Sequence, residues 1–297
     1  MRLLLTGAEG QLGRHLAPLL APIGQLVTTS LAGGDRPCDL TDAAALDALL
    51  DEVRPEVIVN PAAWTGVDAA EEQPESADRL NRILPEALAA WCQQHAALLV
   101  HYSTDYVFDG QPGRPWTEHD APNPVSVYGR SKREGEQAVL ASGARALVLR
   151  TAWLYSACPG NFLSAILARA STGDALRVVR DQIGSPTWAG SLAEMTADLL
   201  RVRGQRNGAV ILHAADRGCM SWHEFATMAV KMAAEADVIK RAVTVEPIDS
   251  SQWPQRAKRP SWSVLNVEAM EAACGRRLPT TEQALSVCLN QWKSITC

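Results

Sequence analysis

Short apolar runs alternate with amphipathic segments along the first half of the chain. The apolar runs predict buried strands at 3–6, 26–29, 57–59, 98–103 and 147–151. Apolar residues at helical spacing predict helices at 13–21, 42–53 and 76–95. Pro18 would weaken the first of these helices, and Thr41 is the expected N-cap of the second. Strands that alternate with helices are typical of βαβ units and a parallel sheet.

The predicted strands are apolar throughout, so helices should cover both faces of the sheet. Right-handed crossovers then give an α/β fold, a Rossmann-like doubly wound parallel sheet, whose ligands bind beyond the carboxyl ends of the strands. After about Asn161 the alternation loosens, which predicts a smaller C-terminal α/β lobe. Helices are expected there at 162–170, 192–203 and 222–236, and loops rich in Pro and Trp at 181–188, 249–254 and 258–262. We expect an NAD(P)-binding domain over 1–152, to which about 186–215 returns, and a substrate-binding lobe over 153–185 and 216–297.

The composition fits a globular protein without a nucleic-acid or membrane partner. Of its 297 residues, 47% are hydrophobic and 21% are charged, and the formal net charge is −5, which disfavours binding to nucleic acid. No apolar stretch is long enough to span a bilayer, and the first apolar run is too short for a signal peptide. The seven cysteines form no C-x-x-C pair, and neither Cys nor His has zinc-ligand spacing. We therefore expect free thiols in the cytoplasm and no metal.

Three spaced glycines follow the first predicted strand. Gly7, Gly10 and Gly13 form G-x-x-G-x-x-G at the start of a helix. Gly7 would permit a tight turn, Gly10 would let a diphosphate approach the backbone, and Gly13 would let the helix pack closely on the strand. The helix N-terminus also offers N–H groups to a diphosphate. This spacing is typical of short-chain dehydrogenases, although a turn with a packing contact is the alternative explanation.

Residues suited to the adenosine end of a dinucleotide come later. Asp39 could accept a hydrogen bond from the adenine amino group and Leu40 could pack on its ring, or Asp39 could be a solvated loop residue. The second strand ends near Ser30, where an acid would bind a ribose 2′-hydroxyl and repel a 2′-phosphate. Arg36 could reach a 2′-phosphate. We expect NADPH as the cofactor, with NADH as the second candidate.

Tyr128 and Lys132 form Y-x-x-x-K, which places both side chains on one face of a helix. Reduction of a ketone needs a hydride at carbon and a proton at oxygen. A phenol has a pKa of about 10, and a nearby ammonium would favour the phenolate and bring that pKa toward neutrality. Thr104, at the end of a predicted strand, suits a hydrogen bond to the carbonyl oxygen. Because Y-x-x-x-K alone occurs by chance in many helices, the prediction depends on its combination with the glycine pattern.

With these motifs the chain resembles the dTDP-4-dehydrorhamnose reductase family of extended short-chain dehydrogenases. The matching segments are 7–13, 39–42, 60–68, 103–110, 128–132, 150–155, 181–187 and 259–260. The resemblance implies NAD(P)H-dependent reduction of the C4 ketone of dTDP-4-dehydro-L-rhamnose to dTDP-L-rhamnose, with Tyr128 as proton donor, Lys132 as its partner and Thr104 tuning the transfer. Together with the glycine pattern, it predicts a cofactor site formed by Gly7, Gly10, Gln11, Leu12, Gly13, Ser30, Asp39, Leu40, Ala62, Ala63, Trp64, Thr65, Tyr128 and Lys132.

The resemblance also implies that Thr104, Asp105 and Trp153 contact the sugar nucleotide. Trp153 could stack on a sugar ring, with core packing as the alternative. Arg259 could clamp the diphosphate of this substrate, or be a solvated arginine. Some family members look like metal-assisted dimers built on acidic side chains near the first helix. Here that helix offers Arg14 and His15, so magnesium is doubtful, and a homodimer is left open.

Two other functions stay open. A nucleotide-sugar epimerase or dehydratase could use the same scaffold, but a dehydratase would need an acid pair beside Thr104, where Asp105 is followed by Tyr106. A non-catalytic regulatory subunit with the reductase fold would tend to lose catalytic residues. Tyr128, Lys132 and Thr104 are all present, which favours the enzyme.

Overall fold

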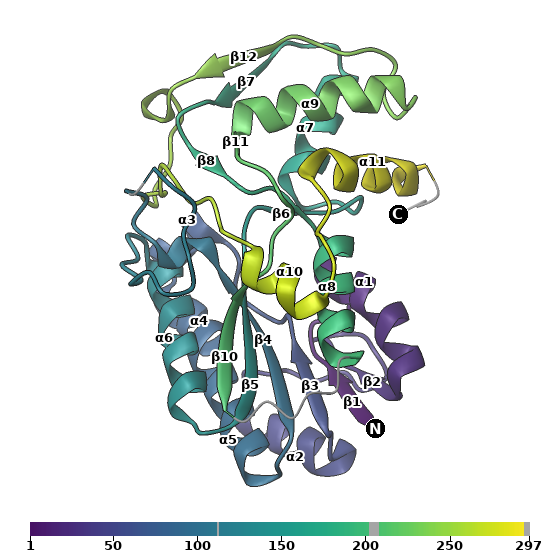
Figure 1. Ribbon diagram of the computed structural model, residues 1–297, viewed down its shortest axis with the longest axis vertical. Coiled ribbons are helices and arrows are strands. Elements are labelled where there is room, and N and C mark those ends of the chain that lie inside the picture. The colour runs from purple at the N-terminus through teal and green to yellow at the C-terminus, as the bar shows by residue number, and fades with distance from the viewer. Residues whose placement is uncertain (112, 202–207, 294–297) are drawn as a thin grey trace.

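A six-stranded parallel sheet forms the centre of the computed structural model, which describes residues 1–111, 113–201 and 208–293. The strand order is β10-β5-β4-β3-β1-β2, and every pairing is parallel (Figure 1). This confirms the predicted Rossmann-like α/β fold. The strands are β1 (Arg2–Leu5), β2 (Gln25–Thr28), β3 (Val57–Asn60), β4 (Leu98–Thr104), β5 (Arg145–Thr151) and β10 (Ala209–His213). The sequence pattern predicted all of them except β10.

Alternate residues along each strand face opposite helix layers, as a parallel sheet buried on both faces requires. Leu3 and Leu5 of β1 share a hydrophobic cluster with residues of α1 (Gln11–Leu20), α8 (Ala189–Arg201) and α10 (Glu268–Cys274). Leu4 belongs to a second cluster with residues of α2 (Ala43–Val53), α5 (Leu84–Gln94) and α6 (Val127–Ala141).

The helix predicted at 76–95 is longer and irregular. It begins with α4 (Pro74–Asp78), continues through a π-turn at Arg79–Ile83 and ends as α5. The π-turn buries Asn81, whose Nδ2 donates to the Trp64 carbonyl and to Ser131 Oγ, both at 3.0 Å. Through these two hydrogen bonds, Asn81 in the π-turn anchors the loop after β3 against α6.

Other element boundaries also differ from the sequence predictions. Asp42, not Thr41, is the N-cap of α2, because its side chain accepts from the N–H groups of Ala44 and Ala45 while Thr41 bonds to Asp39. The first helix begins at Gln11 and is followed by a 3₁₀ turn at Ala21–Ile23. The predicted helix at 192–203 begins earlier, at Ala189, and positions 202–203 lie outside the described residues. A short helix, α3 (Val67–Glu72), was not predicted.

A separate hydrophobic cluster lies in the C-terminal half. It joins α7 (Phe162–Ser171), α9 (Trp222–Glu235), α11 (Thr281–Trp292) and β7 (Leu176–Val179), which pairs with β12 (Val245–Ile248). Figure 1 shows these elements above one end of the six-stranded sheet. Two further short pairs join β6 (Leu154–Tyr155) to β9 (Thr187–Trp188) and β8 (Ile183–Gly184) to β11 (Met220–Ser221). The loops predicted at 181–188 and 249–254 therefore contain β8 and β9, and a 3₁₀ turn at Ser250–Gln252.

Within the described residues, no helix is both long and apolar enough to cross a membrane.

Candidate active site

The glycine turn between β1 and α1 has the geometry of an anion-binding loop. Gly7 has φ +53°, in the left-handed region that favours glycine. A Cβ at Gly13 would collide with the carbonyl oxygen of Gly7, so only glycine lets α1 begin this close to the turn. Gly10 is the N-cap of α1 and has no side chain with which to cap it, and a Cβ there would meet only Gly7 O, at 3.2 Å. The first turn of α1 therefore opens toward a ligand.

A first cavity, of about 600 Å³, lies over this turn. Its lining includes thirteen of the fourteen residues predicted for the cofactor, namely Gly7, Gly10, Gln11, Leu12, Gly13, Ser30, Asp39, Leu40, Ala62, Ala63, Thr65, Tyr128 and Lys132. Trp64 is the exception in the described lining: its backbone is held by Asn81 and its indole Nε1 donates to Gly66 O at 3.2 Å. The lining also includes Thr151, whose buried Oγ1 has no hydrogen-bond partner among the described residues.

The residues present fit a dinucleotide. The cavity joins an open helix N-terminus to the pair Tyr128 and Lys132, and it leaves a buried hydroxyl, that of Thr151, for a polar ligand group. Leu31, Pro61, Leu80 and Tyr102 also line it and were not predicted, because none of them belongs to a short motif for dinucleotide binding.

Tyr128 and Lys132 lie on the buried side of α6, one turn apart. Ser126 caps this helix by accepting from the Gly129 N–H, and a Cβ at Gly129 would collide with the Tyr106 carbonyl. The Lys132 ammonium donates to the Tyr102 carbonyl at 2.6 Å. α6 is thereby fixed against the carboxyl end of β4.

Burial sets the pKa values of this pair. It raises the pKa of Tyr128 to about 12, opposed by a hydrogen bond with Thr104, and it lowers the pKa of Lys132 to about 8, opposed by the carboxylate of Glu136. The expected fall of the Tyr128 pKa toward neutrality is thus not found, because desolvation of the phenolate outweighs the effects that favour it. A tyrosine of high pKa stays protonated at neutral pH, as a proton donor must.

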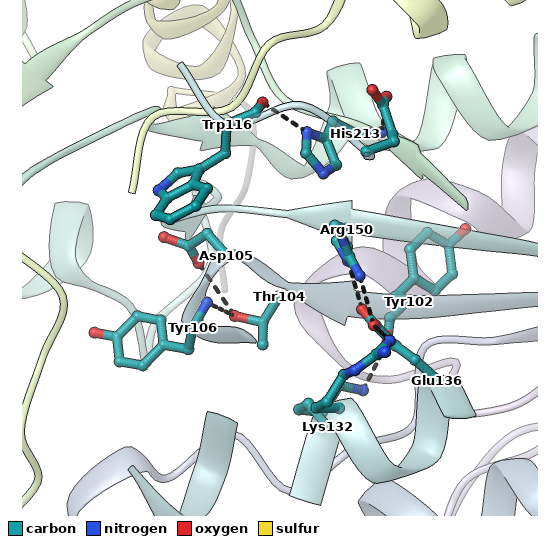
Figure 2. Close-up of polar contacts among 11 residues, drawn as sticks. Tyr102, Thr104, Asp105, Tyr106, Trp116, Lys132, Glu136, Arg150 and His213 are labelled. Carbon is teal, nitrogen blue, oxygen red and sulfur yellow. Dashed lines mark hydrogen bonds and ion pairs between the residues drawn. The ribbon is translucent and has the colours of Figure 1, made fainter. Parts of the chain in front are cut away.

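Behind Lys132, a buried ion pair holds α6 to β5 (Figure 2). Arg150 binds Glu136 through two hydrogen bonds, Nε–Oε1 at 2.7 Å and NH2–Oε2 at 2.8 Å. Arg133 adds a third contact to Glu136 at 2.9 Å, and the Arg150 guanidinium lies 5.1 Å from the centre of the Phe108 ring. The pair therefore links the helix of Tyr128 to the loop that follows Thr104. No sequence motif predicted this pair, although Tyr128, Lys132 and Glu136 recur at intervals of four.

Thr104 and Asp105 lie where β4 ends. Thr104 Oγ1 accepts from the Tyr106 N–H at 3.2 Å and donates to Asp105 Oδ1 at 3.1 Å (Figure 2). Burial raises the pKa of Asp105 to about 7, and its Oδ2 has no partner in the described part of the chain. Thr104 therefore lies between a buried carboxyl group and Tyr128.

A second cavity, of about 650 Å³, adjoins the first through Thr65, which lines both. It carries three arginines, Arg169, Arg177 and Arg259, and the rings of Tyr106, Trp222 and Trp253. Arg259 is oriented by Asp68, with NH2 2.9 Å from Oδ2 and NH1 3.3 Å from Oδ1. The rings of Tyr106 and Tyr128 meet edge to face, 5.6 Å between centroids, so the two tyrosines connect the cavities. Of the residues predicted to contact the substrate, Arg259 is in the described lining of this cavity.

Trp153 lies beside the second cavity without lining it. Its indole stacks on Trp222 at 3.5 Å and 3°, and a Cβ at Gly184 would collide with it. Trp222, which does line the cavity, thus covers one face of the ring predicted to stack on a sugar. Arg36 pairs with Glu52 at 2.7 Å and lies outside the described lining of the first cavity.

The described residues contain no group of three or more His, Cys, Asp or Glu that could hold a metal ion. On α1, Arg14 donates to the Glu9 carbonyl at 2.8 Å and His15 packs edge-on against Trp188.

Comparison with known proteins places the chain in a family. The model of the RmlD substrate binding domain matches residues 1–294. A dTDP-4-dehydrorhamnose reductase of Burkholderia thailandensis is 40% identical over 296 residues, which is 97% of this chain and 98% of that protein. The chain belongs to the dTDP-4-dehydrorhamnose reductase family. The fold of this family also agrees: a member from Clostridium acetobutylicum superposes with a TM-score of 0.88 at 34% identity, covering 99% of this chain and 100% of the other.

A second crystal structure from this family bears on the cofactor. It is a dTDP-4-dehydrorhamnose reductase from Bacillus anthracis in complex with NADP, with a TM-score of 0.88 at 30% identity over 98% of this chain and 99% of that one.

Proposed function

We propose that this protein is an NAD(P)H-dependent reductase of the C4 ketone of dTDP-4-dehydro-L-rhamnose and forms dTDP-L-rhamnose, a precursor for cell-surface polysaccharide. One observation carries the proposal: Tyr128 lines a cavity built over a glycine turn, and its ring contacts Tyr106 in a second, arginine-lined cavity. The relatives named for this reaction support the choice of substrate.

The first cavity would hold the dinucleotide. The turn from Gly7 to Gly13 suits the diphosphate, and Ser30, Asp39 and Leu40 suit the adenosine end. Residues 62–65, including Trp64, with Tyr128 and Lys132, would hold the nicotinamide half. When bound, the reduced nicotinamide supplies the hydride.

In the mechanism, the Tyr128 hydroxyl gives its proton to the ketone oxygen, so that C4 gains a hydride and O4 a proton. The high pKa of Tyr128 keeps this proton in place until charge develops on the oxygen. Lys132, held at the Tyr102 carbonyl, stabilises the phenolate left behind, and Thr104 orients the Tyr128 hydroxyl. The Glu136–Arg150 pair fixes the helix that carries both.

The second cavity would hold the sugar nucleotide. Its diphosphate suits the three arginines of this cavity, Arg169, Arg177 and Arg259. One guanidinium group can bind two phosphate oxygens at once through two parallel hydrogen bonds. Contacts from Asp105 and Trp153 to the sugar stay predictions, as does the division into a cofactor domain (1–152 with 186–215) and a substrate lobe (153–185 and 216–297). We also propose a cytoplasmic location, which the free state of the six described cysteines supports. A homodimer stays a prediction.

The test follows oxidation of NADPH and NADH by absorbance with dTDP-, GDP- and UDP-linked 4-keto sugars. We expect turnover with dTDP-4-dehydro-L-rhamnose and little with the others. Absence of turnover with every keto sugar, by protein that binds the dinucleotide, would overturn the proposal.

A further inference from the structure

The short helix α3 belongs to a stretch of chain that lines both cavities. Positions 62, 63 and 65 line the first cavity, and positions 65–69 line the second. The backbone just before α3 is fixed at Trp64, whose N–H donates to Asn81 Oδ1 at 3.0 Å and whose carbonyl accepts from Asn81 Nδ2 at 3.0 Å. A contact made by α3 can therefore influence how both ligands are held.

Glu71 of α3 binds the start of the helix that carries Tyr128. Its Oε1 accepts from the N–H of Val127 at 2.8 Å, and Val127 is the first residue of α6. The N–H groups in the first turn of a helix have no partner within the helix, and the helix dipole also favours a carboxylate there. Glu71 therefore fixes the end of α6 next to Tyr128, while the contacts of Lys132 and Glu136 fix the turns that follow.

Asp68, one helical turn earlier, binds a loop of the second cavity. Its Oδ1 accepts from the backbone N–H groups of Arg256 at 3.2 Å and of Ala257 at 2.9 Å. The same carboxylate accepts from the Arg259 guanidinium, with NH2 2.9 Å from Oδ2 and NH1 3.3 Å from Oδ1. Asp68 therefore holds the backbone of this loop as well as the arginine that suits the substrate diphosphate.

We propose that Asp68 and Glu71 are positioning residues for the reduction. Glu71 sets the place of the Tyr128 hydroxyl by fixing the start of α6. Asp68 sets the place of the sugar nucleotide by fixing Arg259 and its loop. Because the two carboxylates are three residues apart on one helix, α3 holds the proton donor and the substrate in register with each other. The inference rests on the proposed function, because it takes the second cavity as the sugar-nucleotide site.

The first test breaks the contact with α6 from both sides and measures kcat and KM for dTDP-4-dehydro-L-rhamnose at saturating NADPH. Glu71→Ala removes the acceptor, and Val127→Pro removes the N–H at the first helical position, where proline is tolerated. We expect each variant to lower kcat about tenfold, because a small misplacement of the proton donor slows the transfer, and to change KM less than about twofold. Glu71→Gln keeps an acceptor oxygen and should retain most of kcat.

The second test applies the same assay to Asp68. Asp68→Ala frees the loop and Arg259, so we expect the KM for the sugar nucleotide to rise about tenfold while kcat stays nearly the same. Asp68→Asn keeps an acceptor for the backbone N–H groups and loses the charge that faces Arg259, so its KM should rise less, about threefold. The control is Glu75→Gln, which removes an exposed carboxylate from α4 and should leave kcat and KM unchanged.

The two residues should thus have opposite kinetic effects, which a general loss of α3 would not produce. Circular dichroism checks that each variant folds, and Val127→Pro leaves α3 intact even if Glu71→Ala does not fold. Combined losses in kcat and KM of similar size at Asp68 and Glu71, or full activity of Glu71→Ala and Val127→Pro, would overturn the inference while the proposed function stands. Absence of turnover by the wild type would overturn the proposed function and the inference with it.

Discussion

The two cavities that meet at Tyr128 and Tyr106 would each hold a diphosphate, but they are built in different ways. The first offers backbone: spaced glycines, an uncapped helix start and a lining in which Asp39 and Lys132 are the charged residues described. The second offers side chains, with arginines from α7, from β7 and from the loop that contains Arg259. Backbone recognition needs a local turn and therefore leaves a short motif, whereas side-chain recognition can gather residues from anywhere in the chain.

The largest effect should come from the residue between the cavities. Tyr128→Phe keeps the ring but removes the proton, so we expect kcat to fall about 10²- to 10⁴-fold. Binding of dinucleotide and of sugar nucleotide should change less than about twofold, since neither cavity loses its diphosphate site. Tyr106→Phe, on the other side of the ring contact, is the control and should retain most of kcat. Normal turnover by Tyr128→Phe would show that another group supplies the proton.

Binding of the sugar nucleotide in the second cavity can be weakened without a change in dinucleotide binding. Arg259→Met removes a half-buried guanidinium that Asp68 orients, so we expect the KM for the sugar nucleotide to rise about 10- to 100-fold. The dissociation constant for NADH should stay the same. Arg114→Met, at an exposed arginine paired with Asp120, should leave both values unchanged. Equal losses in the affinities for both ligands would contradict the separation of the two sites.

Two substitutions in the glycine turn separate packing from recognition. Gly13→Ala puts a methyl group against the Gly7 carbonyl, so we expect the free energy of unfolding to fall by about 1–3 kcal/mol in urea denaturation. Gly10→Ala meets little within the protein and should leave stability nearly unchanged while weakening dinucleotide binding. If both substitutions lowered stability alike, the opening at Gly10 would not be a ligand site.

The smallest effect concerns buried carboxyl groups. Burial raises the pKa of Asp105 and of Asp216 to about 7, so between pH 4 and 7 each holds a proton in the folded state that it has lost in the unfolded state. Each therefore makes the free energy of unfolding fall as pH rises through this range. Asp105→Asn and Asp216→Asn each remove one of these titrating groups. Measured by denaturation, the free energy of unfolding of each variant should therefore rise relative to that of the wild type by on the order of 1 kcal/mol from pH 4 to pH 8.

Asp105 and Asp216 should differ in activity. Asp105 accepts from Thr104, whereas Asp216 accepts from the Trp188 N–H at 2.8 Å, away from both tyrosines. We therefore expect only Asp105→Asn to lower kcat. If the difference in free energy of unfolding between each variant and the wild type did not change with pH, neither carboxyl group would be desolvated.

The same contrast explains what the sequence could predict. The five predicted strands of the sheet and the glycine turn under the first cavity followed from apolar runs and three spaced glycines, because both are local patterns. The Glu136–Arg150 pair joins α6 to β5, and the arginines of the second cavity come from separate segments, so no short motif marks either. The N-cap of α2 was misplaced by one residue, because Thr41 and Asp42 are both good caps and only the bond from Thr41 to Asp39 decides between them.

The central claim is net reduction at the sugar carbon by a hydride and a proton from Tyr128. It is tested most directly with NADH or NADPH deuterated at nicotinamide C4, followed by mass spectrometry and NMR of the sugar nucleotide. The account predicts one deuterium at C4 of dTDP-L-rhamnose for each dinucleotide oxidised, and almost none with Tyr128→Phe. A product without deuterium, or a converted sugar with no net oxidation of the dinucleotide, would contradict it and favour an epimerase.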